Sequence, residues 1–99
     1  MTKSELVQKL TKMYPHLYQR DINLLVETIL GEISGTLASG GRVELRGFGA
    51  FSVRKRDARV ARNPKNGKEV KIDERFAIYF RTGKELREKI NKSQTTPNH

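Results

Sequence analysis

Apolar residues in the first forty positions recur every three or four residues, which is the spacing of amphipathic helices. Residues 2–5 have the pattern of a capping box just before the first apolar run, and Pro15 cannot continue a helix. A second and longer apolar stripe covers residues 22–37 and is followed by two glycines. We therefore predict one helix over residues 3–14 and another over 18–39.

Beyond the two glycines the apolar residues alternate with polar ones, as they do in strands. Residues 42–46 alternate strictly, residues 50–53 begin a second strand, and residues 76–80 are apolar enough to form a buried strand. The segment between the last two, at about 54–75, has too few apolar residues to bury a face of its own. We predict that it forms a long two-stranded ribbon with its turn at residues 63–67, where Asn-Gly favours a hairpin.

The expected fold class is α+β. It has two N-terminal helices, a three-stranded antiparallel sheet extended by the two-stranded β-ribbon arm, and a short C-terminal helix opened by residues 83–87. A single domain is expected over residues 1–91, with a flexible polar tail over 92–99. The core is expected to contain four phenylalanines: Phe48, Phe51, Phe76 and Phe80.

Without its arm the body has roughly 75 residues, a size at which a monomeric core is marginal, and an isolated two-stranded ribbon is barely stable. Both difficulties ease when two chains share one core, so we expect an intertwined, obligate dimer with two arms.

Charge is distributed very unevenly along the 99 residues. The net charge is +9, yet residues 1–40 sum to zero, and residues 54–71 carry eight cations against Asp57 and Glu69. This concentration implies a polyanionic partner, with nucleic acid favoured over a membrane surface.

Other function classes find little support in the composition. The chain has no cysteine, which excludes disulfide scaffolds and cysteine-ligated zinc. His16 and His99 do not form a catalytic set, the nucleotide-binding glycine patterns are absent, and no cofactor is implied, so an enzyme is not expected. Neither a membrane-spanning stretch nor a signal peptide is evident, so we expect a soluble cytoplasmic protein.

Three segments together resemble the HU/integration host factor family of bacterial DNA-bending proteins: residues 47–51, 59–68 and 83–87. The resemblance covers residues 1–91 in register. The charged segment 42–46, directly before Gly47, is most similar to the branch formed by the beta chains of integration host factor. The chain departs from the usual family pattern at Ala61 and Asn66, which leaves its fine sequence preference open.

The resemblance implies that each arm enters the minor groove of double-stranded DNA and that Pro64 wedges between base pairs. Composition alone favours an ordinary turn proline at this position, but the flanking Arg62, Asn63 and Lys65 favour the wedge. Along the ribbon, Arg59, Arg62, Lys68 and Lys71 are expected to share one groove-lining face. The alternative is a solvated charged hairpin.

Two further groups of candidate DNA-binding residues lie in the body. Glu44 is expected to hold Arg42 and Arg46 by bidentate pairing and aim them at DNA, unless the three form an ordinary exposed ladder. Helix N-termini offer free amides together with a cation, although capping alone is the alternative there. The cations concerned are Lys3, Lys84 and Arg87.

The resemblance thus implies a nucleoid-associated protein that bends DNA and assists recombination, replication and the control of transcription and translation. Its expected partner is a homologous alpha subunit in a heterodimer, with a homodimer also possible. The alternatives are an HU-like homodimer that binds DNA without sequence preference, an RNA-binding or ribosome-associated protein, and a chromatin coat that binds without bending.

Overall fold

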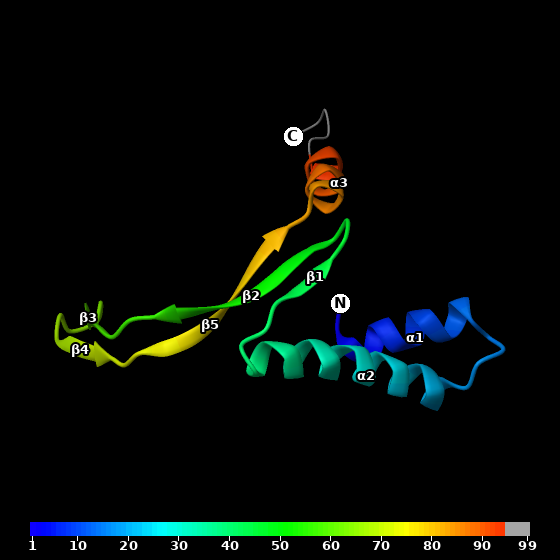
Figure 1. The fold of residues 1–99 in the computed structure, drawn as a ribbon, viewed down its shortest axis with the longest axis horizontal. Helices are drawn as coiled ribbons and strands as arrows, with labels where there is room; N and C mark the ends of the chain where they lie inside the picture. Colours follow the sequence, from blue (N-terminus) through cyan, green and yellow to red (C-terminus); the bar gives the residue numbers. More distant parts are fainter. Residues whose placement is uncertain (95–99) are drawn as a thin grey trace. The chain divides into compact units, whose positions relative to one another are not determined.

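The computed structural model describes residues 1–94 and divides the chain into two compact units, Met1–Thr36 and Leu37–His99. The element order is the one expected from the sequence pattern: two helices, five strands and a third helix (Figure 1). The predicted α+β class is confirmed, with an antiparallel three-stranded sheet and a separate two-stranded ribbon.

The N-terminal unit consists of α1 (Lys3–Met13) and most of α2 (Gln19–Ala38). The Thr2 hydroxyl caps α1 by accepting a hydrogen bond from the Glu5 amide at 3.1 Å, as the capping-box pattern predicted. Val7, Ile22 and Val26 form the buried cluster of this unit, and Leu6 and Leu10 pack against it. Both predicted helices are therefore confirmed to within one residue at each end.

Part of the apolar stripe of α2 is not covered within the chain. Leu24, Leu25 and Ile29 are each more than half exposed, although Leu25 and Ile29 belong to the predicted apolar stripe. Helical spacing correctly identified the face, but a single chain does not supply enough apolar surface to bury it.

The three-stranded sheet has the order β1-β2-β5, with β1 (Val43–Leu45), β2 (Gly49–Arg56) and β5 (Arg75–Thr82) all antiparallel to their neighbours. The register places Phe51 opposite Val43 on one side and opposite Phe80 on the other. Because residues directly opposite each other point to the same face of a sheet, apolar side chains gather on one face.

The arm continues from the far ends of β2 and β5, as Figure 1 shows, and consists of β3 (Arg59–Arg62) paired with β4 (Glu69–Ile72). No residue of either strand is buried, which agrees with the expectation that this segment has no core of its own. The predicted ribbon over about residues 54–75 is confirmed.

The C-terminal helix, α3 (Lys84–Gln94), is held against the turn between β1 and β2. The Gly83 amide donates to the Phe48 carbonyl at 2.8 Å, and the Leu86 amide donates to the Gly47 carbonyl at 3.1 Å. Gly47 has a φ of +83°, and a Cβ there would lie 2.7 Å from the Glu85 carboxylate. The positive φ favours glycine at this position, whereas the flexible Glu85 side chain can move aside and does not by itself require it.

Two sequence-based expectations need correction. The polar tail was expected to begin at residue 92, but α3 continues to Gln94, so three of its residues are helical; residues 95–99 lie outside the described part. The four phenylalanines were assigned to the core, but the core of one chain does not include them all: Phe76 is 70 % exposed, and Phe48 and Phe80 are also exposed. Phe80 does contact Phe51 and Phe48, with ring centroids 4.6 and 5.6 Å apart, but the apolar face is covered only in part within the chain.

Candidate nucleic-acid interface

The face of the sheet opposite the apolar one is rich in arginine. Ala50 lies opposite Glu44 on β1 and opposite Arg81 on β5, so these three residues share a face. Alternation along the strands brings further arginines to the same side. We call this set the arginine face: Arg42, Arg46, Arg54, Arg56, Arg75 and Arg81.

One pair on this face indicates what kind of ligand it suits. Arg56 and Arg75 are directly opposite each other across β2 and β5. Like charges in such a pair repel each other and destabilise a sheet. A polyanion bound over the pair would remove this repulsion, so the arrangement favours a ligand that carries repeated negative charge.

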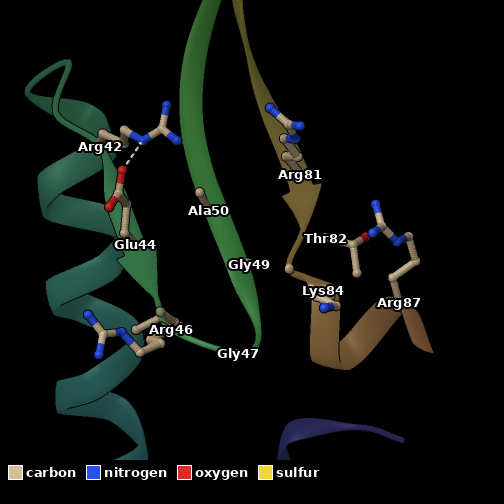
Figure 2. Close-up of a pocket in the computed structure, with 12 residues that line it drawn as sticks. Arg42, Glu44, Arg46, Gly47, Gly49, Ala50, Arg81, Thr82, Lys84 and Arg87 are labelled. Carbon is tan, nitrogen blue, oxygen red and sulfur yellow. Dashed lines mark hydrogen bonds and ion pairs between the residues drawn. The ribbon is translucent and has the colours of Figure 1, made fainter. Parts of the chain in front are cut away.

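Where the sheet meets α3, an open groove of about 680 Å³ lies beside the arginine face. Figure 2 shows Arg42 and Arg46 on the β1 side of the groove, Arg81 on β5, and Lys84 and Arg87 on α3. Glu44 is the single acidic residue among those that line it. The groove therefore carries a strong positive charge.

Within the groove, Glu44 is paired with one of its two neighbouring arginines. Its Oε1 accepts from Arg42 Nε at 2.7 Å, and both side chains are largely exposed. The sequence led us to expect that Glu44 would hold Arg42 and Arg46 together by bidentate pairing, but the contact is a single hydrogen bond. No ion pair joins Arg46 to an acid within residues 1–94, so its charge is not neutralised there.

The first turn of α3 contributes cations, but fewer free amides than expected. The amides of Gly83 and Leu86 are already bonded to the carbonyls of the β1–β2 turn. Two of the amides at the start of this helix are thus used within the chain and are not available to an anion. Lys84 and Arg87 remain exposed and line the groove, which keeps them as candidates through their side chains.

The ribbon distributes its cations differently from the sheet. The register pairs Arg59 with Ile72 and Val60 with Lys71. Arg59 therefore points to one face, whereas Arg62 and Lys71 point to the other. The prediction that one face carries them all is wrong, because residues 59 and 62 are an odd number of positions apart. Lys68 lies in the turn segment before β4.

The tip of the arm is held by its two asparagines. The Asn63 side-chain oxygen accepts from the Lys65 amide, and the Asn66 side-chain oxygen accepts from the Lys68 amide, both at 2.9 Å. The Gly67 amide donates to the Asn63 carbonyl at 2.7 Å, and Gly67 has a φ of +69°. The Asn63 oxygen thus has a structural role. Pro64 and Lys65 are left exposed at the end of the arm.

The remaining predicted cation, Lys3, lies in the N-terminal unit. Its ammonium donates to the Glu27 carboxylate at 2.5 Å. The hydrogen bond from Lys3, together with its charge, holds the pKa of Glu27 below its ordinary value of 4.5. Any phosphate that binds Lys3 must therefore compete with this carboxylate.

Sequence reasoning missed four members of the arginine face, namely Arg54, Arg56, Arg75 and Arg81. The missing information was the register, although a signal was present: Arg75, Ala77, Tyr79 and Arg81 alternate with apolar residues. Arg54 is further marked by its guanidinium carbon, which lies 3.6 Å from the centroid of the Tyr79 ring.

The remaining features of the described residues add no other kind of site. Within residues 1–94 no helix is both long and apolar enough to cross a membrane. The same part of the chain contains no cluster of three or more side chains suited to holding a metal ion.

An α+β fold with an arginine-rich sheet face and a cationic arm defines a protein that binds polyanions. The model of the family described as "Bacterial DNA-binding protein" matches residues 1–91, and the chain belongs to this family. Its fold and sequence are similar to HU from Anabaena in a cocrystal with DNA, at 33 % identity over 91 % of this chain and 97 % of that one, with a TM-score of 0.79. HU from Thermotoga maritima is 28 % identical over 91 % and 98 % of the two chains, with a TM-score of 0.61.

Membership of this family makes the protein a DNA-binding architectural protein and not an enzyme.

Proposed function

We propose that this protein binds double-stranded DNA as a dimer and bends it sharply with its two arms. The observation that carries the proposal is the combination of the arginine face with a separate cationic ribbon that ends in an exposed proline. The sheet would bind DNA phosphates from one side. The arms would then reach around the duplex, and the contacts they gain would offset a bending cost of up to ~10 kcal/mol.

The distribution of charge on the ribbon supports entry into the minor groove. A ribbon inserted there lies between two phosphate backbones, so cations are useful on both of its faces. Arg59 on one face, and Arg62 and Lys71 on the other, meet this requirement. At the tip, Pro64 presents a rigid apolar ring between charged neighbours, which suits a wedge that unstacks a base step.

The uncovered apolar surface supports a dimer. Ile78 is 63 % exposed on the apolar face of the sheet, and α2, in the other unit, has exposed leucines and isoleucines of its own. Only four apolar side chains in the described chain are buried: Val7, Ile22, Val26 and Leu37. A chain with so small a core is marginal alone, and a second copy or a homologous chain would cover these faces.

Within the family, the segment 42–46 favours a beta chain of integration host factor over HU. In this proposal Arg46 binds DNA from the groove, and Arg42 assists it while paired with Glu44. A homologous alpha subunit would complete a heterodimer. The protein would act at the nucleoid in the cytoplasm, and it would assist recombination, replication and the control of transcription and translation by bringing distant sites together.

The alternative is an HU-like homodimer that binds DNA without sequence preference. The identity of 33 % with Anabaena HU over nearly the whole of that chain favours this second candidate. The two candidates differ in one measurable property, the ratio of affinities for a preferred site and for random DNA.

The proposal is tested by fluorescence energy transfer between the ends of a ~35-bp duplex, long enough for arms that wrap the DNA. The chain alone is titrated at fixed salt and the experiment is then repeated with a homologous alpha chain. We expect a large rise in transfer at one dimer per duplex. Binding with no rise under both conditions would reject bending and favour a chromatin coat. Stronger binding to RNA than to the DNA duplex would favour the RNA-binding alternative.

A further inference from the structure

Arg54 and Tyr79 form a stacked pair in the middle of the arginine face. Tyr79 on β5 lies opposite Ser52, and Arg54 is two residues further along β2, so the two side chains are diagonal neighbours on one face. The guanidinium carbon is 3.6 Å from the ring centroid, which is close contact between the planar group and the ring. Tyr79 is half-buried, whereas Arg54 is exposed.

The cations of this unit are held in two different ways. Arg42 is held by the Glu44 carboxylate, and Lys55 by Glu74 at 3.2 Å. A carboxylate orders its cation but neutralises the charge and competes with an incoming phosphate. An aromatic ring contacts the flat side of a guanidinium and leaves its charge and its N–H donors available. Within residues 1–94 no ion pair involves Arg54.

We infer that Tyr79 is a positioning residue for DNA binding. It fixes the Arg54 guanidinium before DNA arrives and leaves its N–H edges free for phosphate oxygens. This inference rests on the proposed function, since it assigns the partner of Arg54 as a phosphate of the duplex. Because a free arginine loses rotamer freedom on binding, an ordered one binds more tightly with no additional contact.

The test compares the affinities of full-length variants for the same ~35-bp duplex at one salt concentration, since such affinities are salt-dependent. Tyr79→Leu removes the ring, and we expect affinity to fall about three- to tenfold. Tyr79→Phe retains the ring and is expected to bind within about twofold of the wild type. Tyr18→Leu is the matched control, because Tyr18 also lies beside an arginine, Arg20 at 5.2 Å, but in the N-terminal unit.

Tyr79→Leu combined with Arg54→Gln separates a positioning role of Tyr79 from a general structural role. If Tyr79 acts through Arg54, Tyr79→Leu has little further effect in that background. Arg54→Lys provides a second route should the leucine variant fail to fold. It keeps the charge but not the planar stack, so a loss similar to that of Tyr79→Leu is expected.

Three results would overturn the role of Tyr79 while leaving DNA binding intact. These are unchanged affinity for both Tyr79→Leu and Arg54→Lys, a loss in Tyr79→Phe as large as that in Tyr79→Leu, or an undiminished loss in the Arg54→Gln background. Absence of DNA binding by the wild type, under conditions in which the chain is folded, would instead reject the proposed function and this inference together.

Discussion

The sheet and the ribbon of this protein are both antiparallel and both rich in cations, yet they arrange these cations differently. In the sheet the arginines lie on one face and the apolar side chains on the other. In the ribbon Arg59 points to one face and Arg62 and Lys71 point to the other, and both faces are exposed. The sheet thus has one apolar face and one cationic face, which suits a strand layer that covers a core and, in the proposed function, binds DNA on its other side. The ribbon has cations on both faces, which suits a ligand that surrounds it.

The largest expected effect is on stability, and it tests whether the sheet covers a core while the ribbon does not. Val53 lies on the apolar face of β2, opposite Ile78, and Val60 lies on the ribbon, where it is 60 % exposed. We expect Val53→Asp to destabilise the folded dimer by about 3 kcal/mol or more, because it buries a charge without a partner. Val60→Asp is expected to change stability by no more than about 0.5 kcal/mol.

Thermal unfolding and sedimentation without DNA measure both changes. Equal stability of the two variants would show that the apolar face of the sheet stays exposed to solvent, and would contradict the dimer.

The second prediction separates binding by the sheet from bending by the ribbon. One variant combines Arg46→Gln, Arg75→Gln and Arg81→Gln on the arginine face, and the other combines Arg59→Gln, Lys65→Gln and Lys71→Gln on the arm. Each is expected to lower the slope of log affinity against log salt by about 0.9 per lost phosphate contact.

Fluorescence energy transfer between the two ends of the duplex, measured when the DNA is saturated with protein, distinguishes the two variants. We expect the arm variant to lose part of its bending and the face variant to retain it. Equal bending by both variants would mean that the sheet and the ribbon do not divide these tasks.

The third prediction concerns the tip of the ribbon. Pro64→Ala removes the rigid ring but no charge, so we expect the bend to decrease by more than the affinity does. Lys65→Ala is the neighbouring control, and it should lower the salt slope while leaving most of the bend. Titrations that follow fluorescence energy transfer and binding together measure both the bend and the affinity. If Pro64→Ala lowers bend and affinity equally, or lowers neither, the wedge role is wrong.

The smallest expected effect concerns Lys3, the one predicted DNA-binding residue outside the sheet and ribbon unit. Because the pKa of Glu27 lies below 4.5 in the folded chain, this carboxylate stabilises the fold above pH 4.5, and the stabilisation is lost as pH falls through the lowered value. Glu27→Gln removes this dependence, so wild type and variant should converge in stability at acid pH. The effect is small, because both side chains are about half exposed.

Unfolding by denaturant at several pH values measures this difference, and Glu32→Gln on the same helix is the control. If the free energy of unfolding differed between wild type and Glu27→Gln by the same amount at all pH values, this would contradict the lowered pKa of Glu27. In DNA titrations Glu27→Gln should bind slightly more tightly if Lys3 contacts a phosphate, because the competing carboxylate is gone.

The sequence by itself determined the kind and order of the elements. The change in apolar spacing after residue 41 separates helices from strands, and the glycine, proline and asparagine positions place the turns. It also located the cationic segment and the exposed tip, since these depend on composition and local turn chemistry. Such features involve residues close together in the chain, and local rules describe them well.

Only the tertiary structure decided which charges act together. Strand register places Arg54, Arg75 and Arg81 on the face that carries Arg42, and it separates Arg59 from Arg62. Packing of α3 against the β1–β2 turn occupies two of the amides that the sequence left free for an anion, those of Gly83 and Leu86. Register and packing join residues that are distant in the chain, and a shift of one position would exchange the two faces of a strand, so spacing along the sequence alone does not determine them.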